Sequence, residues 1–153
     1  MIETYDDRAG IAGSIFYKVY KNDRLIETVA DHNLVVNGGR EWLAKLVCGD
    51  SLTRITKLGL GDSSLVESLT DSAITNCFVV ALAGHSVGAS SLTDFSSAVT
   101  FNWTVEKNQA NGLNIREFGL MTSDDILVTR QVRGSVIGKA DDIRIVGTYT
   151  LHF

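Results

Sequence analysis

The sequence lacks proline altogether and contains only two cysteines and three histidines among its 153 residues. Because proline normally makes up about 5% of a globular chain, the fourteen glycines must supply most of the turn geometry. Cys48 and Cys77 are far apart, each beside apolar residues, and are interpreted as buried free thiols of a protein made in a reducing compartment. His32, His85 and His152 lack the short spacing of metal ligands, so neither a metal nor another cofactor is predicted.

Two further absences limit the partners. No apolar run reaches the roughly 18 residues of a membrane span, and the acidic N-terminus has no apolar segment of the kind found in signal peptides. The net charge of −4 argues against the basic face of a nucleic-acid-binding protein. We therefore expect neither a membrane nor a nucleic acid as a partner.

The sequence is rich instead in alternating apolar and polar residues over 97–153. Val99, Phe101, Trp103 and Val105 fall on one face of an extended chain, and polar residues fall on the other. The same period of two continues to the last residue. It predicts β-strands with one buried face, and it places Phe101 and Trp103 in the core.

Other segments extend this pattern toward the N-terminus. Earlier strands are expected at 13–20, 25–30, 54–60 and 73–83. The first two are expected to pair as a hairpin through the polar segment 21–24, and the apolar run 73–83 suits a strand buried on both faces. The polar segments 61–72 and 84–97 are expected to be long loops.

One helix is predicted over 38–48. Asn37 suits its N-cap and Gly49 its C-terminal end. One face of this helix carries Trp42, Leu43, Leu46 and Val47. The chain is therefore expected to be mainly β, a single antiparallel β-sandwich over 13–153 with this short capping helix, preceded by an N-terminal arm over 1–12.

Two local signals refine the C-terminal strands. Asn111 and Gly112 both tolerate positive φ and predict a hairpin that joins a strand at 98–107 to one at 113–121. Within the second strand the apolar phase slips, since Ile115 is followed by Phe118. A β-bulge near Glu117 or Gly119 would explain the slip.

Two short motifs are similar to hydrolase signatures. Residues 84–88 match G-x-S-x-G, in which Ser86 would be the nucleophile at a strand-to-helix turn. Residues 89–97 show no helical face, so the required turn is not expected. Residues 61–65 are one position out of step with a GDSL signature and lack its Asp-x-x-His. The first motif is interpreted as part of the loop 84–97 and the second as a polar turn after a strand. The protein is predicted not to be an enzyme, and a small hydrolase using Ser86 is the third alternative, after the two given below.

Several short pieces of sequence also occur in an order that is similar to that of a known protein family. They include a Gly-rich turn after a strand, a Glu-aromatic-Gly-Leu step (Glu117 to Leu120) and an arginine strand containing Arg130. The pieces are 33–44, 55–62, 101–105, 110–112, 115–120, 127–130, 137–139 and 146–153. In this order they resemble small virion structural proteins of tailed bacteriophages, often tail, baseplate or tail-fibre proteins. The prolines common in the family's loop after the Gly-rich turn are missing here.

The resemblance implies a non-enzymatic virion subunit, made in the host bacterial cytoplasm, that contacts other virion proteins and copies of itself. Capsid decoration is the alternative within this class, and a carbohydrate-binding adhesin domain is the alternative outside it. Long polar loops and an N-terminal arm are the surfaces that such contacts would use. The candidate interface residues are Tyr5, Asp62, Ser63, Ser64, His85, Ser86, Ser90 and Ser91.

Overall fold

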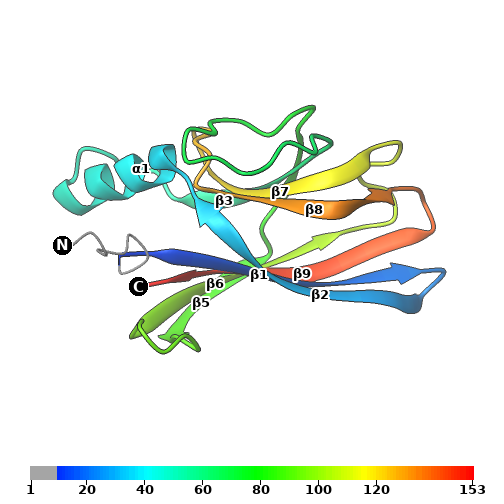
Figure 1. Cartoon of the computed structure of the whole chain (residues 1–153), viewed down its shortest axis with the longest axis horizontal. Coiled ribbons are helices and arrows are strands. Elements are labelled where there is room, and N and C mark those ends of the chain that lie inside the picture. Colours follow the sequence, from blue (N-terminus) through cyan, green and yellow to red (C-terminus); the bar gives the residue numbers. More distant parts are fainter. Residues whose placement is uncertain (1–9) are drawn as a thin grey trace.

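A computed structural model describes residues 10–153, which form nine strands and one helix (Figure 1). The strands are β1 (Ala12–Lys21), β2 (Arg24–Val35), β3 (Ile55–Gly61), β4 (Phe78–Ala81), β5 (Gly84–Ala89), β6 (Ser97–Val105), β7 (Asn114–Thr122), β8 (Thr129–Gly138) and β9 (Ile143–His152). The helix is α1 (Asn37–Cys48). The expected mainly-β class with one helix is confirmed.

The strands form one antiparallel sheet rather than the two sheets of a sandwich. Their order is β4-β3-β7-β8-β2-β1-β9-β6-β5. The sheet curls into a half-barrel, so β7 and β8 lie across the core from β1 and β9 (Figure 1). The sandwich prediction is wrong because β2 belongs to both layers. It pairs with β1 along most of its length, and its last residues, Leu34 and Val35, pair with Arg130 and Thr129 of β8.

Polar side chains bridge the gap where β2 and β8 diverge. Gln131 Nε2 donates to Asp31 Oδ2 at 3.0 Å, and Arg133 Nη2 donates to Glu27 Oε1 at 2.9 Å. The buried Arg133 guanidinium also donates to the Tyr17 hydroxyl and lies 5.6 Å from the centroid of its ring. These contacts stabilise the curl because each joins one layer to the other.

The core fills the inside of the curl with the inward residues of every long strand. Tyr17, Trp103 and Phe118 pack together with ring centroids 4.9–6.0 Å apart. Phe101 and Trp103 are buried, as the alternation predicts. At about 1.5–3 kcal/mol for each large apolar side chain, this burial is the main stabilising term of the fold.

The two predicted hairpins have different outcomes. The first is confirmed, since β1 pairs with β2 and Asn22 and Asp23 adopt the positive φ of a tight turn. The second is wrong, since β6 pairs with β5 and β9 whereas β7 pairs with β3 and β8. The Asn111-Gly112 turn lies instead in a crossover between the layers. Lys139 holds it there by donating to Asn111 Oδ1 at 2.8 Å.

The central segments differ most from expectation. In the apolar run 73–83 only 78–81 form a strand, and that strand is at one edge of the sheet with Val80 as its buried residue. Residues 84–89, expected in a loop, form β5 at the other edge. The bulge near Glu117 is confirmed, because the β7–β8 register shifts between Ile115 and Glu117.

The predicted N-cap is wrong by one residue: Val36 is the N-cap, without a side-chain capping bond, and Asn37 is the first helical residue. The helix ends at Cys48, and the C-cap Gly49 has the expected left-handed φ, 83°. Cys48 and Cys77 are free as predicted, but both are exposed rather than buried. Strand β1 already begins at Ala12, within the predicted arm, and residues 1–9 of that arm lie outside the described part of the chain.

Candidate functional site

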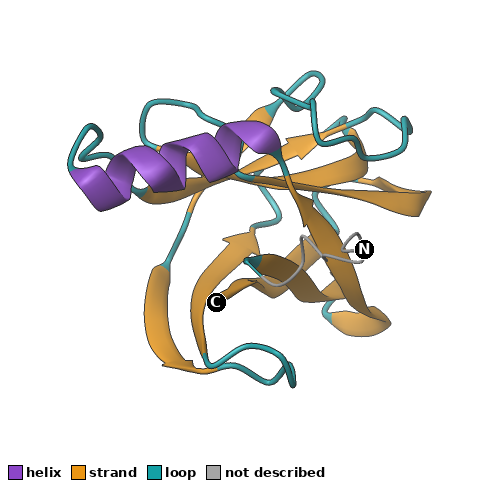
Figure 2. Cartoon of the chain, turned by 60° about the vertical axis from the view of Figure 1, so that its left-hand side comes forward, coloured by secondary structure: helices purple, strands orange, loops and turns teal. Residues whose placement is uncertain are grey.

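The described surface has a groove of about 660 Å³ between α1 and the β5 edge of the sheet. Figure 2 looks toward this end of the molecule, with α1 across the upper part. The groove is lined mainly by apolar side chains from four separate segments. They include Trp42 and Leu46 of α1, Leu52, Ile55, Leu82, Val87 of β5, and Val99 and Phe101 of β6.

The groove exists because the two edges of the curled sheet meet only at one corner. There the N–H of Leu82 donates to the Thr56 carbonyl, and the N–H of Ala83 donates to the Asn102 carbonyl. The chain thus steps from β4 at one edge directly to β5 at the other. Beyond this corner β5 pairs with β6 alone. Its other edge therefore carries backbone groups that no strand of residues 10–153 pairs with.

Helix α1 covers only part of the opening. Of the apolar face of this capping helix only Trp42 is buried, and Leu46, which lines the groove, is 37% exposed. Leu52 and Val87 add to this surface, with 89% and 74% of their surface exposed. Monomeric proteins seldom leave apolar side chains grouped in this way unless the surface binds something.

A few polar groups border the apolar lining. Trp42 Nε1 donates to Thr53 Oγ1 at 3.0 Å, which holds the start of the 50–54 segment against the helix. Arg54 and His85 also line the groove, and both are exposed. The His85 ring lies 6.2 Å from the Phe101 ring, tilted by 51°. The groove can therefore accept an apolar segment that carries an acidic group.

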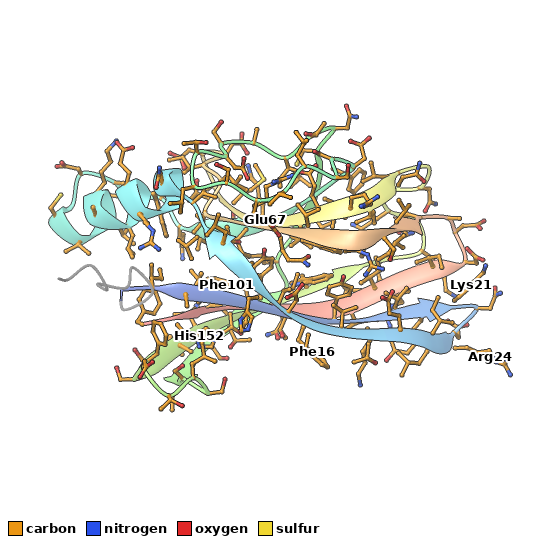
Figure 3. The ribbon with its side chains drawn as sticks, in the orientation of Figure 1. Phe16, Lys21, Arg24, Glu67, Phe101 and His152 are labelled. Atoms are coloured by element: carbon orange, nitrogen blue, oxygen red, sulfur yellow. The ribbon has the colours of Figure 1, made fainter. Side chains whose placement is uncertain are left out.

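A smaller apolar cavity of about 160 Å³ continues the groove beneath α1. It shares Trp42 and Phe101 with the groove, and its far wall is formed by Ile11, Leu151 and Phe153. The two hollows together run across the ends of β5, β6, β9 and β1. Figure 3 labels Phe101 near this end, whereas Lys21 and Arg24 mark the opposite end of the molecule.

The predicted residues Asp62, Ser63 and Ser64 lie in a different region, the segment 62–77 over the outer face of β3, β7 and β8. A fully buried carboxylate fixes this segment. Glu117 Oε2 accepts hydrogen bonds from the N–H of Ser63 at 2.9 Å and from that of Thr75 at 3.1 Å. Asp62 accepts one from Asn76 at 2.8 Å, and Ser64 is exposed.

Arg130 completes the anchor that holds segment 62–77. Its Nε donates to Glu117 Oε1 at 2.9 Å, and its Nη1 donates to Asp71 Oδ2 at 2.9 Å. Burial opposes the charge of the guanidinium, but Glu117 and Asp71 outweigh it, so the pKa of Arg130 is raised. Glu117 and Arg130 thus form an ion pair between β7 and β8. Both residues are buried, so neither offers a charge to a partner.

Glycines let segment 62–77 lie flat on the sheet. A Cβ at Gly61 would be 2.4 Å from Glu117 Oε2 and 2.5 Å from the Thr75 carbonyl oxygen. A Cβ at Gly119 would be 3.1 Å from Ile74 Cδ1 in this segment and 2.7 Å from the Thr129 carbonyl oxygen of β8. The Gly-rich turn and the Glu-aromatic-Gly-Leu step therefore serve one purpose, the close packing of this segment on its buried anchor.

The other predicted residues divide between the groove and a second polar contact. His85 lines the groove, whereas Ser86, one position along β5, is on the opposite face of the sheet. Ser90 Oγ lies 2.8 Å from Nδ1 of His152, and Ser91 is exposed. Tyr5 lies outside the described residues.

His152 joins residues that are distant in the sequence. Its Nε2 is 2.9 Å from Ser14 Oγ, and its ring centroid is 6.1 Å from that of Phe95. Burial lowers the pKa of His152, and the charge of His32 lowers it further, so the neutral ring is favoured near pH 7. A neutral ring can donate to one serine and accept from the other. This contact fixes the loop after β5 to the sheet.

The G-x-S-x-G motif does not form a nucleophile elbow. Ser86 lies in the middle of β5, with no helix after it, and it pairs across the strands with Thr100. Within residues 10–153, no three His, Cys, Asp or Glu side chains gather closely enough to hold a metal ion. No helix in that same range combines the length and apolar character needed to cross a membrane.

Sequence reasoning missed most of the groove. Leu52 and Val87 stand singly in polar surroundings, and the two edges that bring them together could not be paired from the sequence. The one signal in the sequence was a single apolar residue within a polar segment, Leu52 in 50–54 and Val87 in 84–97. No family model, no curated protein and no solved structure matches this chain.

Proposed function

We propose that this chain is a non-enzymatic structural subunit of a tailed-bacteriophage virion, at the tail, baseplate or fibre attachment, and that it binds a partner protein in the groove between α1 and β5. The observation that carries the proposal is the exposed apolar lining of the groove beside an unpaired strand edge. The order of motif pieces that resembles such virion proteins supports the same class.

The partner would bind by adding a strand. One edge of β5 pairs with no strand of the described residues 10–153, and an extended segment pairing with that edge would gain backbone hydrogen bonds. Because side chains alternate along a strand, every second residue of that segment would point toward the groove, beside Val87 and His85. Leu52 and Leu46 would cover those side chains from the other side.

The chemistry of the groove defines the segment that fits it. Apolar side chains would fill the lining, and an acidic residue among them would lie near Arg54 and His85. Exposed charges of this kind add modest affinity and mainly select the partner and its direction. The favoured partner is therefore an extended, apolar segment with acidic residues. The same surface would serve a capsid-decoration protein.

A carbohydrate-binding adhesin domain is the second candidate, and one observation favours it. Phe16, 43% exposed, lies on the outer face of the sheet with Ser14, Thr148 and Thr150 nearby in register. An exposed ring among hydroxyl groups can stack on a sugar. Glycan-array binding that is lost in Phe16→Ala would favour this function over the virion role.

Incorporation into virions tests the proposal. Immunogold labelling of virions from the source should place the chain at the tail tip or fibres, and gold over the head would instead favour decoration. Virions that stay unlabelled by an antibody able to detect the antigen would overturn the virion role.

A phage complemented with Leu52→Glu should assemble without the subunit or fail to assemble. Leu25→Glu is the matched control, because Leu25 is also exposed but lies at the far end of the β1–β2 hairpin. Equal incorporation of both variants would remove the groove from the proposal.

A further inference from the structure

We propose that the groove and the smaller cavity beneath α1 together form a binding site for a free fatty acid of medium chain length. The hydrocarbon chain would fill the cavity, and the carboxylate would lie at Arg54 and His85 in the mouth of the groove. The inference goes beyond the proposed function, because the binding of such a ligand requires neither a virion nor a partner protein.

The two hollows are continuous with each other. The side chains that line both of them are Trp42, Leu46, Ile55, Val99 and Phe101. The groove has a volume of about 660 Å³, which lies within the range of roughly 300–1,000 Å³ that is usual for small-molecule sites. The cavity of about 160 Å³ adjoins it along the shared side chains. A ligand in the groove can therefore extend beneath the helix.

The inner cavity suits a hydrocarbon chain. Its lining side chains are aliphatic or aromatic, and the polar atom among them, Trp42 Nε1, already donates to Thr53 Oγ1 at 3.0 Å. Apolar cavities of this size stay dry, and one of about 150 Å³ binds benzene, a molecule of six carbon atoms. The cavity can therefore take about six carbons of a single chain. A phospholipid has two chains to bury, so the free fatty acid fits better.

The main chain of a peptide fits this cavity poorly. Each of its residues would carry an N–H and a C=O into a space whose side chains offer them no partner, and a buried polar group without a hydrogen bond is costly. A strand added to β5 avoids this cost, because its backbone groups pair with the edge of β5. The cavity is therefore suited to a different ligand from the strand edge.

The mouth of the groove has the charge that a carboxylate requires. Arg54 and His85 line it, and within residues 10–153 no aspartate or glutamate belongs to the lining. Both residues are close to the junction of the two hollows, since Arg54 precedes Ile55 and the His85 ring lies 6.2 Å from that of Phe101. Guanidinium and imidazole N–H groups both donate to carboxylate oxygens. An apolar interior with a cationic mouth matches an amphipathic anion.

Equilibrium dialysis of the purified full chain with hexanoate, octanoate and decanoate tests the site. We expect saturable binding that strengthens about fourfold for each added methylene, because burial of a CH₂ group is worth about 0.8 kcal/mol. The fluorescence of Trp42 should change along the same saturation curve, since Trp42 lines both hollows. Trp103, the other tryptophan, is buried in the core and does not line them.

A pair of valine variants tests the position of the chain. Val99→Phe places a larger side chain at the junction of the two hollows and should weaken decanoate binding by more than about tenfold, since a chain kept out of the cavity loses several buried methylenes. Val136→Phe is the matched control, on an exposed valine of β8 that lines neither hollow. Urea unfolding checks that both variants are folded.

A pair of arginine variants tests the position of the carboxylate and does not depend on the valine variants. Arg54 is exposed, so Arg54→Gln should weaken decanoate binding only about two- to fivefold and leave the binding of decanol unchanged. Arg24→Gln is the control, because Arg24 is also exposed but lies at the opposite end of the molecule (Figure 3).

Three results would overturn the proposal. They are the absence of saturable decanoate binding, decanoate binding that is unchanged in folded Val99→Phe, and equal affinity for decanoate and decyltrimethylammonium. The virion role is tested separately, because these measurements use the purified chain alone. Failure here leaves that role standing, and normal incorporation of Leu52→Glu would leave the fatty-acid site standing.

Discussion

The segments 62–77 and 82–97 lie on either side of the edge strand β4 in the sequence, but they are held in opposite ways. The first lies on a fully buried carboxylate, Glu117, that accepts hydrogen bonds from three donors, and on glycines that permit contact. The second begins with β5, whose side chains are exposed beside an open apolar groove. Satisfied buried polar groups fix one structure, whereas unfilled apolar surface leaves room for a partner.

The difference indicates where function belongs. A buried ion pair contributes little net stability, but losing one partner costs much, so segment 62–77 cannot rearrange without exposing or orphaning a charge. The groove has no such constraint. The sequence pieces 55–62, 115–120 and 127–130 build the fixed region, whereas 33–44 and 101–105 contribute Trp42 and Phe101 to the groove.

Removal of the buried carboxylate should have the largest effect. Glu117→Gln leaves the Arg130 guanidinium buried beside Asp71 alone, and we expect the free energy of unfolding to fall by about 3 kcal/mol, the lower end for breaking a buried pair. Urea denaturation measures the change.

Glu106→Gln is the control for that experiment, since its pair with Arg144 is largely exposed and is worth at most about 1 kcal/mol. Equal losses in the two variants would contradict the special role of the buried anchor.

A glycine exchange compares the two regions directly. Gly61→Ala places a Cβ against Glu117 and Thr75, and overpacking of this kind costs about 1–3 kcal/mol. Gly88→Ala in β5 meets nothing within 4 Å and should change stability by less than about 0.5 kcal/mol. Thermal or urea unfolding of both variants measures the contrast. A tolerated Gly61→Ala would mean that segment 62–77 is not tightly packed.

The contact between His152 and the loop after β5 should make stability depend on pH. Because burial lowers the pKa of His152, the unfolded chain binds its proton more readily. The stabilisation is therefore complete above the ordinary histidine pKa of about 6.5 and is lost as the pH falls below it.

Urea unfolding of the wild type and of His152→Gln between about pH 8 and pH 5 isolates this effect, since the carboxylates titrate in both proteins. The difference in stability should shrink as the pH falls. A difference that stays constant over this range would contradict the assignment.

Much of the fold was predictable because alternating apolar and polar residues show which side chains of a strand are buried. It located β6 to β9, the β1–β2 hairpin and the buried positions of Phe101 and Trp103. It could not give strand pairing. Asn111-Gly112 has the local chemistry of a hairpin, but the burial of Trp103 in one layer and of Ile115 in the other sends the chain across the core.

The groove was harder to predict because it lies beside an edge of β5 that pairs with no strand of residues 10–153, and a sequence pattern does not show which strand edges stay unpaired. Leu46 has the helical spacing of a buried residue, and only the structure shows that it lines an open groove and is 37% exposed. The sequence predicts a loop at Val87 because residues 84–97 are rich in Ser and Gly. The His152–Ser14 contact joins residues 138 positions apart, for which no local signal exists.

The smallest effect on stability, and the sharpest test of the comparison, should come from the groove itself. Val87→Ala removes methyl groups that are mostly in solvent, so unfolding should change by less than about 0.5 kcal/mol. Val80→Ala, on the other edge strand, empties a buried site and should cost about 1.5–3 kcal/mol. A loss of more than about 1 kcal/mol for Val87→Ala would make the groove part of the core. Unchanged stability together with weaker virion incorporation would separate binding from folding at one side chain, as an open binding surface requires.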